Sequence, residues 1–310
     1  MTHHVAVALV GPTASGKSAL AHSLAFEQHD QVEILCVDAM TVYRGMDLAT
    51  AKPTRIERSE VSYHLLDLVA PGEEFTVAQF QEVARAAAAD VWRAGHKVLY
   101  VGGTGLYGRA VLDDLAIPGQ FPSVRALLDE RAHDELPALY AELEALDSLA
   151  ASRMEATNAR RIVRALEVTL GAGRPFSSYG EGLATYGPTR VVQVALQSDF
   201  EQLDLRIASR FRTWMDDGLL EEVTSLASAP GGMSRTARQA VGYRELLRHV
   251  EDGADLEACV EDAIIQSRRL ARRQRSWFLR DPRIEWFDDA ERARARLLAV
   301  LNGPHGYVRD

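Results

Sequence analysis

The sequence predicts an α/β fold in which helices flank a parallel sheet and an all-helical domain is inserted. Two observations support this prediction. In the N-terminal third of the chain, short apolar runs alternate with stretches of helical periodicity, which is typical of doubly wound parallel sheets. Residues 122–172 then break the alternation, because they are rich in Ala, Leu, Glu and Arg and keep helical periodicity throughout. We therefore expect a core from residues 1–120 and 190–310, and a helical insertion domain from residues 121–189.

Local patterns place the individual elements. Thr76 and Gly95 are suitable caps for a helix between them. Residues 171–188 are rich in Gly, Pro and Ser and predict a loop that returns to the core. The final stretch contains Trp286 and Phe287, and we expect a frayed end after them. Short apolar runs predict strands at residues 5–10, 33–37, 97–101 and 191–196, and residues 63–67 are expected to form another strand or the end of one. Helical periodicity predicts helices within residues 201–228 and 236–280.

The composition is that of an ordinary globular protein. The chain has 310 residues, of which 47% are hydrophobic and 25% charged, enough for one large or two modest domains. No stretch approaches the ~20 apolar residues that span a bilayer, and the N-terminal residues 1–4 contain no basic segment or cleavage pattern. Cys36 and Cys259 give neither a disulfide framework nor a metal-ligand spacing. We expect a cytoplasmic protein without membrane contact. The net charge of −9 argues only weakly against a nucleic-acid partner, because phosphate-binding surfaces are local.

A glycine-rich motif follows the first predicted strand. Residues 11–18 read GPTASGKS, which has the G-x-x-x-x-G-K-S spacing of a P-loop, and helical periodicity continues after it. Glycines allow backbone N–H groups to approach an anion, and the helix N-terminus adds free donors. Such a turn could also need its glycines for steric reasons alone, and the motif leaves open whether the phosphate belongs to ATP. The core is therefore expected to be P-loop NTPase-like, with the phosphate held by Gly11, Pro12, Thr13, Ala14, Ser15, Gly16, Lys17 and Ser18, and with Mg²⁺ at the Ser18 hydroxyl.

Two further polar residues follow predicted strands. Ligands of doubly wound sheets bind beyond the carboxyl ends of the strands, so Asp38 and Thr104 are expected near the P-loop. Asp38 could be a Mg²⁺ ligand, a general base or a turn residue. Thr104 lies in residues 103–108, which fit G-x-G-x-x-G. A dinucleotide site requires this motif after the first strand and an acidic residue ~20 positions later. A second loop that lines the phosphate pocket is therefore the better interpretation.

Arginines gather on two predicted helices. Arg268, Arg272 and Arg275 share one helical face, and Arg269 and Arg273 share a neighbouring one. A second cluster, in the insertion, contains Arg153, Arg160, Arg161 and Arg164. Such density is typical of a surface that binds a nucleic-acid backbone, although a solvated face with ion pairs is the alternative. Arg206 and Arg210 lie one turn apart and could contact a phosphate or form surface ion pairs.

Seven motifs in this order resemble the bacterial tRNA dimethylallyltransferase family, also called tRNA isopentenylpyrophosphate transferases. The resemblance covers nearly the whole chain, and the set is far more specific than any single motif. The motifs are GPTASGKS (11–18), YRGMD with TAKP (43–53), YHLLD (63–67), GGTGLY (102–107), RRIVRALEV (160–168), QAVGYRE (239–245) and RRLARRQRSWF (268–278).

The resemblance implies that the P-loop binds dimethylallyl diphosphate and that the prenyl group is transferred to N6 of adenosine 37 in tRNA. It implies that the catalytic residues are Asp38, Thr104, Lys17 and Arg210, with Mg²⁺ as cofactor, and that the helical insertion grips the anticodon stem-loop. The active protein is expected to be a monomer. The tRNA-binding positions implied are Asp38, Ala39, Met40, Thr41, Thr104, Arg125, Arg160, Arg161, Ile162, Val163, Arg164, Gln239, Ala240, Val241, Gly242, Tyr243, Arg244, Arg269 and Arg273.

The sequence departs from the family pattern at three places. Relatives commonly have Asp-Ser-x-Gln where this chain has residues 38–41 as Asp-Ala-Met-Thr, Ala49 replaces a glycine, and residues 156–158 replace a Pro-Asn-Asp run. Asp38 is retained, so these changes concern tRNA contact. Three alternatives remain at this point: a P-loop kinase of a nucleotide or small metabolite, an adenylate isopentenyltransferase, and a non-enzymatic RNA-binding GTPase-like module.

Overall fold

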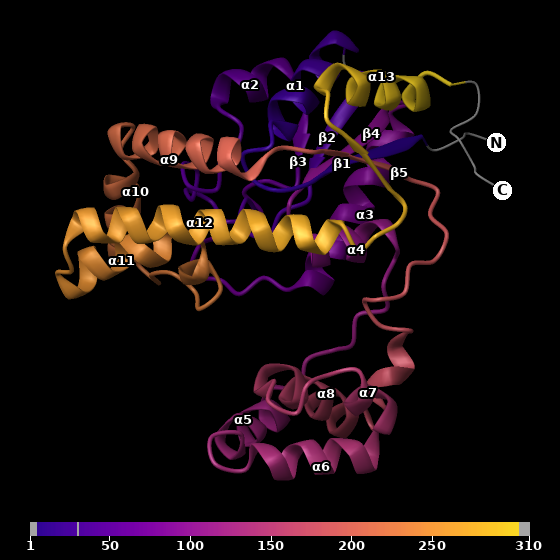
Figure 1. Cartoon of the computed structure of the whole chain (residues 1–310), viewed down its shortest axis with the longest axis vertical. Helices are drawn as coiled ribbons and strands as arrows, with labels where there is room; N and C mark the ends of the chain where they lie inside the picture. Colours follow the sequence, from indigo (N-terminus) through magenta and orange to yellow (C-terminus); the bar gives the residue numbers. More distant parts are fainter. Residues whose placement is uncertain (1–4, 30, 304–310) are drawn as a thin grey trace. The chain divides into compact units, whose positions relative to one another are not determined.

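The computed structural model describes residues 5–29 and 31–303, which form two compact units (Figure 1). One unit comprises Met1–Asp114 and Pro188–Asp310, and the other Leu115–Gly187. Both divisions fall a few residues before the boundaries expected from composition. Residues 1–4, where the sequence shows no targeting pattern, and the last part of the expected frayed end, from residue 304 on, lie outside the described residues. None of the helices within the described ranges has the length and apolar character needed to cross a membrane.

The first unit contains a six-stranded sheet in the order β3-β2-β4-β1-β5-β6. Every pairing is parallel, and β1 lies between β4 and β5, which confirms the predicted sheet. Because all strands run the same way, the carboxyl ends of β1, β2 and β4 lie side by side. The strands are β1 (Ala6–Val10), β2 (Val32–Cys36), β3 (Tyr63–His64), β4 (Lys97–Gly102), β5 (Val192–Leu196) and β6 (Ile284–Phe287).

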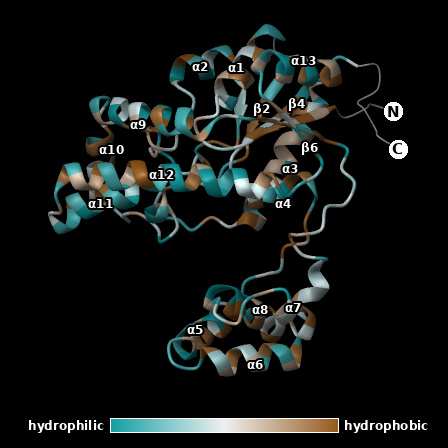
Figure 2. Ribbon diagram, viewed as in Figure 1, coloured by the Kyte–Doolittle hydropathy of each residue, from teal (hydrophilic) through white to brown (hydrophobic). Residues whose placement is uncertain are grey.

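Helices cover both faces of the sheet. Along β1, Val7 and Leu9 point into the apolar cluster formed with α1 (Lys17–Glu27) and α13 (Ala290–Leu301), whereas Ala6, Ala8 and Val10 point into the cluster on the other side. In Figure 2 the strands of the sheet are coloured mostly brown, which marks apolar residues. The second cluster includes residues of α3 (Val77–Arg93), α4 (Gly105–Leu112), α9 (Phe200–Asp216), α10 (Leu219–Ser228), α11 (Tyr243–Asp252) and α12 (Leu256–Phe278).

Helix boundaries follow capping signals in the sequence. Thr76 caps α3 with a reciprocal capping box to Gln79, and Gly95 follows the helix with a φ of 86°. Gly218 and Gly253, both at positive φ, separate α9 from α10 and α11 from α12. The long α12 packs against both α9 and α11 (Figure 1). Two short helices complete this unit, α2 (Arg55–Glu60) and the 3₁₀ helix η2 (Ala237–Gln239).

Two predicted segments differ in the structure. The strand expected at residues 63–67 ends at His64, because Leu65 and Asp67 have φ values of 66° and 55°, which a strand excludes. The expected fraying after Phe287 is wrong for most of that segment, because β6 pairs with β5 and α13 buries Leu297 and Leu301 against the sheet. The strands β3 and β6 are short, and their positions, like that of α13, depend on contacts with residues distant in sequence.

The second unit is entirely helical, as the sequence predicts. Its core is formed by apolar residues of α6 and α8, including Leu139, Leu143 and Leu166. Gly171 is required in α8 because a Cβ there would lie 2.1 Å from the Phe121 ring. The helices are α5 (Pro122–Arg131), α6 (Leu136–Leu146), α7 (Ser148–Ser152), α8 (Ala159–Ala172) and the 3₁₀ helix η1 (Phe176–Tyr179).

Candidate active site

The loop between β1 and α1 has the backbone geometry of an anion cradle. Gly11, Ala14 and Gly16 adopt φ values of 140°, 62° and 93°. Such interruptions turn successive N–H groups toward one concave side, which favours an anion. Gly16 precedes α1 without a side-chain cap, so the first turn of the helix keeps donors for a ligand. Ala14 is a non-glycine residue in the left-handed region, a conformation that is often found where a loop serves a ligand.

Lys17 lies across this loop and is sensitive to two charged neighbours. Its Nζ donates to the carbonyl of Pro12 at 3.1 Å. Burial and, to a smaller extent, the positive charge of Arg210 lower the pKa of Lys17 to about 8, while the negative charge of Asp38 partly opposes the shift. The three charges therefore lie in one electrostatic neighbourhood. At neutral pH Lys17 is mostly protonated and available to a phosphate.

Helix α9 supplies two arginines to the outer side of the loop. Nη2 of Arg210 donates to Oγ1 of Thr13 at 2.7 Å, and its guanidinium lies 4.6 Å from the Trp214 ring centroid. Burial lowers the pKa of Arg210 to about 10, so it stays charged at neutral pH. Arg206 donates to the carbonyl of Ala14. Neither arginine forms an ion pair within the described ranges, so their charges remain available to an anion.

Asp38 and Thr104 meet at the ends of β2 and β4. Oγ1 of Thr104 donates to Oδ2 of Asp38 at 3.0 Å and accepts from the Ala39 N–H. The Met40 N–H donates to the other carboxylate oxygen at 2.8 Å. These bonds hold the carboxylate in one orientation. Because Thr104 uses its hydroxyl in this way, it gives no side-chain cap to α4, although it occupies the N-cap position.

The glycines around Thr104 are explained by close packing. A Cβ on Gly102 would lie 2.0 Å from the Val37 carbonyl, and one on Gly105 would lie 2.1 Å from Nε1 of Trp277. The motif therefore brings β4 against the end of β2 and against α12. This supports the interpretation of a second pocket loop and explains the glycines without a dinucleotide.

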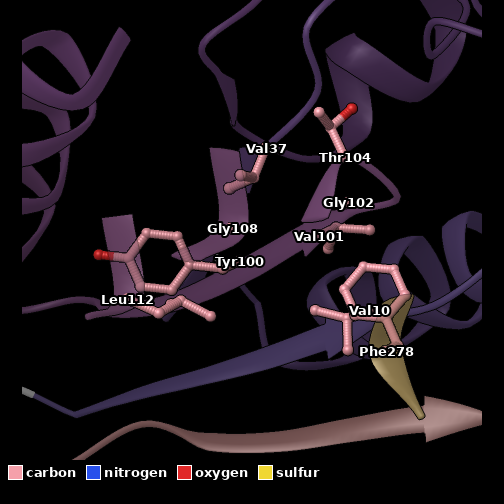
Figure 3. A pocket seen from close by; sticks show the side chains of 9 residues that line it. All are labelled: Val10, Val37, Tyr100, Val101, Gly102, Thr104, Gly108, Leu112 and Phe278. Carbon is pink, nitrogen blue, oxygen red and sulfur yellow. The ribbon is translucent and has the colours of Figure 1, made fainter. Parts of the chain in front are cut away.

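A small apolar cavity lies beside Thr104 (Figure 3). Apolar side chains from β1, β4, α4 and α12, together with Val37 just after β2, form most of its wall, and Thr104 lies at its edge. The cavity is only about the size of a water molecule, so it is not by itself a site for a five-carbon chain. The lining residues are Val10, Val37, Tyr100, Val101, Gly102, Thr104, Gly108, Leu112 and Phe278.

The arginines of α12 divide into two groups. Arg272 forms a two-pronged ion pair with Asp204 of α9, and Arg268 donates to the Asp204 carbonyl. Arg275 stacks on the Phe200 ring at 4.7 Å. Arg269 and Arg273 are exposed, and neither pairs with an acid in the described part of the chain. The predicted shared faces are therefore real, but only the face of Arg269 and Arg273 remains free.

The arginines of the helical unit divide in the same way. Arg125 and Arg164 both pair with Glu167, whose side chain is only 4% exposed. Arg160 and Arg161 are exposed, without an ion-pair partner among the described residues. Ile162 and Val163, expected at the tRNA interface, are buried in the core of this unit, so their side chains have a packing role.

The predicted segment 239–244 is also mostly structural. Tyr243 is fully buried, and its hydroxyl donates to Glu222, which also accepts from the Asp47 and Leu48 N–H groups. Gly242 has a φ of 96° and an ideal Cβ position 2.9 Å from the Cβ of Ala49. In the rest of this segment Ala240 is buried, Val241 and Arg244 are half-buried, and Gln239 is exposed.

The other predicted tRNA-binding segment follows Asp38. Its residues Ala39 and Met40 are half-buried, and Thr41 is buried.

Sequence reasoning missed three residues that shape the site. Glu222 gave no signal, since a glutamate on an amphipathic helix is ordinary. Lys52 belongs to the TAKP motif, but no role was predicted for it. The structure shows its buried amine paired with Asp47 and Asp67. Gln274 stood among the arginines of α12, and its side chain accepts the Thr13 N–H of the P-loop at 2.8 Å. The sequence did offer one indication of Gln274, since it is a polar residue that lies on neither of the two arginine faces of this helix.

The donor set for a metal is small. Within the described ranges no group of three His, Cys, Asp or Glu side chains could hold a metal ion. Ser18 is exposed in the first turn of α1, next to Lys17. One hydroxyl beside an anion cradle fits Mg²⁺, which usually keeps waters and takes its remaining ligands from substrate phosphates.

The fold and the site define a P-loop-like α/β protein. Its anion-binding loop lies in the electrostatic neighbourhood of the Asp38 carboxylate, which Thr104 holds in place. A model of the family described as IPP transferase matches residues 41–281. The chain belongs to this family.

Relatives share most of this chain. A tRNA dimethylallyltransferase of Bifidobacterium animalis is 42% identical over 90% of this chain and 81% of its own length. One from Salinispora arenicola is 45% identical over 92% and 82%. The tRNA isopentenylpyrophosphate transferase structure from Bacillus halodurans covers 96% of this chain and 95% of its own, with 31% identity and a TM-score of 0.67. A eukaryotic dimethylallyltransferase acting on tRNA, 23% identical, covers 96% and 79% with a TM-score of 0.78, which supports the fold.

Proposed function

We propose that this chain transfers a dimethylallyl group from dimethylallyl diphosphate to N6 of adenosine 37 in tRNA and releases diphosphate. The proposal rests on one observation above all. A carboxylate held by Thr104 and by the Met40 N–H lies in the electrostatic neighbourhood of the P-loop lysine. Family membership and the names of the relatives support the same activity.

The residues fit both halves of this reaction. The N6–C1 bond forms as the C1–O bond breaks, and the amine loses a proton. Asp38, whose carboxylate is held by Thr104 and by the Met40 N–H, would accept that proton. The leaving diphosphate gains negative charge, which Lys17, Arg210 and the N–H groups of the loop would stabilise.

Magnesium would bind at Ser18. Its hydroxyl lies at the N-terminus of α1, where oxygens of a bound diphosphate would complete the ligand set. When bound, Mg²⁺ would offset charge on the diphosphate. The charge of Lys17 would act on the same group from the protein side.

The tRNA would be held by exposed arginines. Arg160 and Arg161 in the helical unit, and Arg269 and Arg273 on α12, have side chains free for phosphates. The target base must leave its stack to reach a pocket at the strand ends. The half-buried Ala39 and Met40 next to Asp38 are suited to packing against that base.

The test is mass analysis of tRNA nucleosides after incubation with protein, Mg²⁺ and dimethylallyl diphosphate. We expect one dimethylallyl group on adenosine 37, and none on a tRNA with guanosine at that position. Parallel reactions contain AMP, ADP, or ATP with candidate acceptors. Prenylation of the free nucleotides without tRNA modification, or transfer of the ATP γ-phosphate, would overturn the proposal.

A further inference from the structure

The side chain of Gln274 reaches the P-loop from α12. Its Oε1 accepts the Thr13 N–H at 2.8 Å, although the two residues are 261 positions apart. The side chain of Thr13 accepts a hydrogen bond from Arg210 of α9. Thr13 is therefore held by two different helices, through its backbone by α12 and through its side chain by α9.

The other end of the Gln274 carboxamide lies against the second loop. An ideal Cβ on Gly103 would lie 2.6 Å from Nε2 of Gln274 and 3.2 Å from the Gly11 carbonyl. Any side chain at position 103 would therefore require the carboxamide to move. The group is thus wedged between the P-loop and the loop that contains Thr104.

This placement affects the anion cradle directly. Since the Thr13 N–H donates to Gln274, it does not serve a phosphate, and the cradle consists of the donors that follow it. The carboxamide also sets how closely the P-loop approaches residues 103–104. Thr104 in turn orients Asp38. One side chain therefore links the part of the site that receives the leaving group to the part that receives the proton.

We propose that Gln274 is a positioning residue that fixes the spacing between the P-loop and the Thr104–Asp38 pair. This inference rests on the proposed prenyl transfer. In that reaction the acceptor amine, the prenyl carbon and the leaving oxygen must align. Misplacement by ~1 Å can lower a rate by about 10²-fold with little change in ground-state binding.

The experiment compares Gln274→Ala with a matched control, Gln266→Ala. Gln266 lies about two turns earlier on the same helix, where its amide donates to Asp262. We expect Gln274→Ala to lower kcat about 10- to 100-fold while KM for each substrate changes less than about threefold. The control should keep wild-type kcat, and both variants should melt within a few degrees of the wild type.

A second variant tests the same spacing from the opposite side. Gly103→Ala would displace the carboxamide, so it should lower kcat in the wild-type background. It should have a smaller effect when Gln274 is already alanine, because the clash with Nε2 is then absent. Non-additivity in this double-mutant cycle is a readout that a purely stabilising glutamine would not produce.

The outcomes separate the two claims. Wild-type protein that transfers no dimethylallyl group to tRNA refutes the proposed function, and the inference falls with it. If the wild type and Gln266→Ala are active and Gln274→Ala keeps kcat within about twofold, the positioning claim alone is overturned. A rate loss matched by an equal rise in KM for dimethylallyl diphosphate, or additive effects of the two substitutions, would also overturn it.

Discussion

The two units of this molecule use polar side chains in different ways. At the strand ends of the first unit, Asp38, Thr104 and Lys17 bond within the site and leave donors or acceptors for a ligand. In the helical unit, Arg125 and Arg164 are used to hold Glu167, a buried carboxylate of the scaffold. Charge density along the sequence looks similar in both regions. The identity of each partner is what distinguishes a site from a scaffold.

The same distinction divides each arginine cluster. On α12, Arg272 is fixed by Asp204 whereas Arg269 and Arg273 are free, and on α8, Arg164 is fixed by Glu167 whereas Arg160 and Arg161 are free. Substitutions of different arginines within one cluster should therefore affect different properties of the protein. The fixed arginines should affect stability and the free ones should affect RNA binding.

The largest effect is expected at the strand ends, for Asp38→Asn. The amide keeps the size of the side chain and can still accept from Thr104, but it cannot take the proton of the amine. General-base loss should lower kcat by about 10²- to 10⁴-fold. Single-turnover assays with tRNA and dimethylallyl diphosphate measure this, and tRNA affinity measured by filter binding should change little. Turnover at the wild-type rate would show that Asp38 is not the base.

The second effect is a pH dependence of diphosphate binding. The free protein holds the pKa of Lys17 at about 8 through burial and the nearby charge of Arg210. The protonated form is therefore lost as pH rises through that value, and binding of dimethylallyl diphosphate should weaken above it. Because the anion favours charged Lys17, binding near this pH should take up a proton.

Calorimetry without tRNA measures this uptake in buffers of different ionisation enthalpy. Lys17→Met should weaken binding about 10- to 100-fold, as expected for loss of a charged hydrogen bond. It should also remove the pH dependence. A pH dependence that survives in Lys17→Met would assign the titration to another group.

Sequence patterns were sufficient for most of the fold and for part of the site. The P-loop motif and the strand-end rule placed Lys17, Asp38 and Thr104 together because parallel strands end at one edge of a sheet. They could not find β6, which is short and pairs with a distant strand, or α13, which packs on the sheet through contacts with distant segments. Nor could they find Gln274 or Glu222, since each acts through a contact with a remote loop. Periodicity also could not show which arginine on a helix has an acid opposite it.

A third, smaller effect tests the α12 arginines. Arg269→Ala and Arg273→Ala together should weaken tRNA binding and reduce the salt slope by about 1 to 2, one for each lost phosphate contact. Arg272→Ala should leave that slope nearly unchanged, because its guanidinium is bound to Asp204. Binding titrations over a range of KCl concentrations measure the slope. Equal slopes for all variants would mean that this face of α12 does not contact tRNA.

The smallest effect is expected in the helical unit, for Arg164→Met. The substitution leaves buried Glu167 paired with Arg125 at 3.5 Å and accepting a hydrogen bond from the Phe121 N–H. Loss of one partner of a buried charge should cost about 1–3 kcal/mol, less than for a fully buried pair because Arg164 is itself partly exposed. Urea unfolding, monitored by the hydrogen exchange of backbone amides in α8, measures this cost. Arg161→Met, on the exposed face of the same helix, should leave stability unchanged but weaken tRNA binding. If Arg161→Met destabilises the unit as much as Arg164→Met, the division into fixed and free arginines does not hold there.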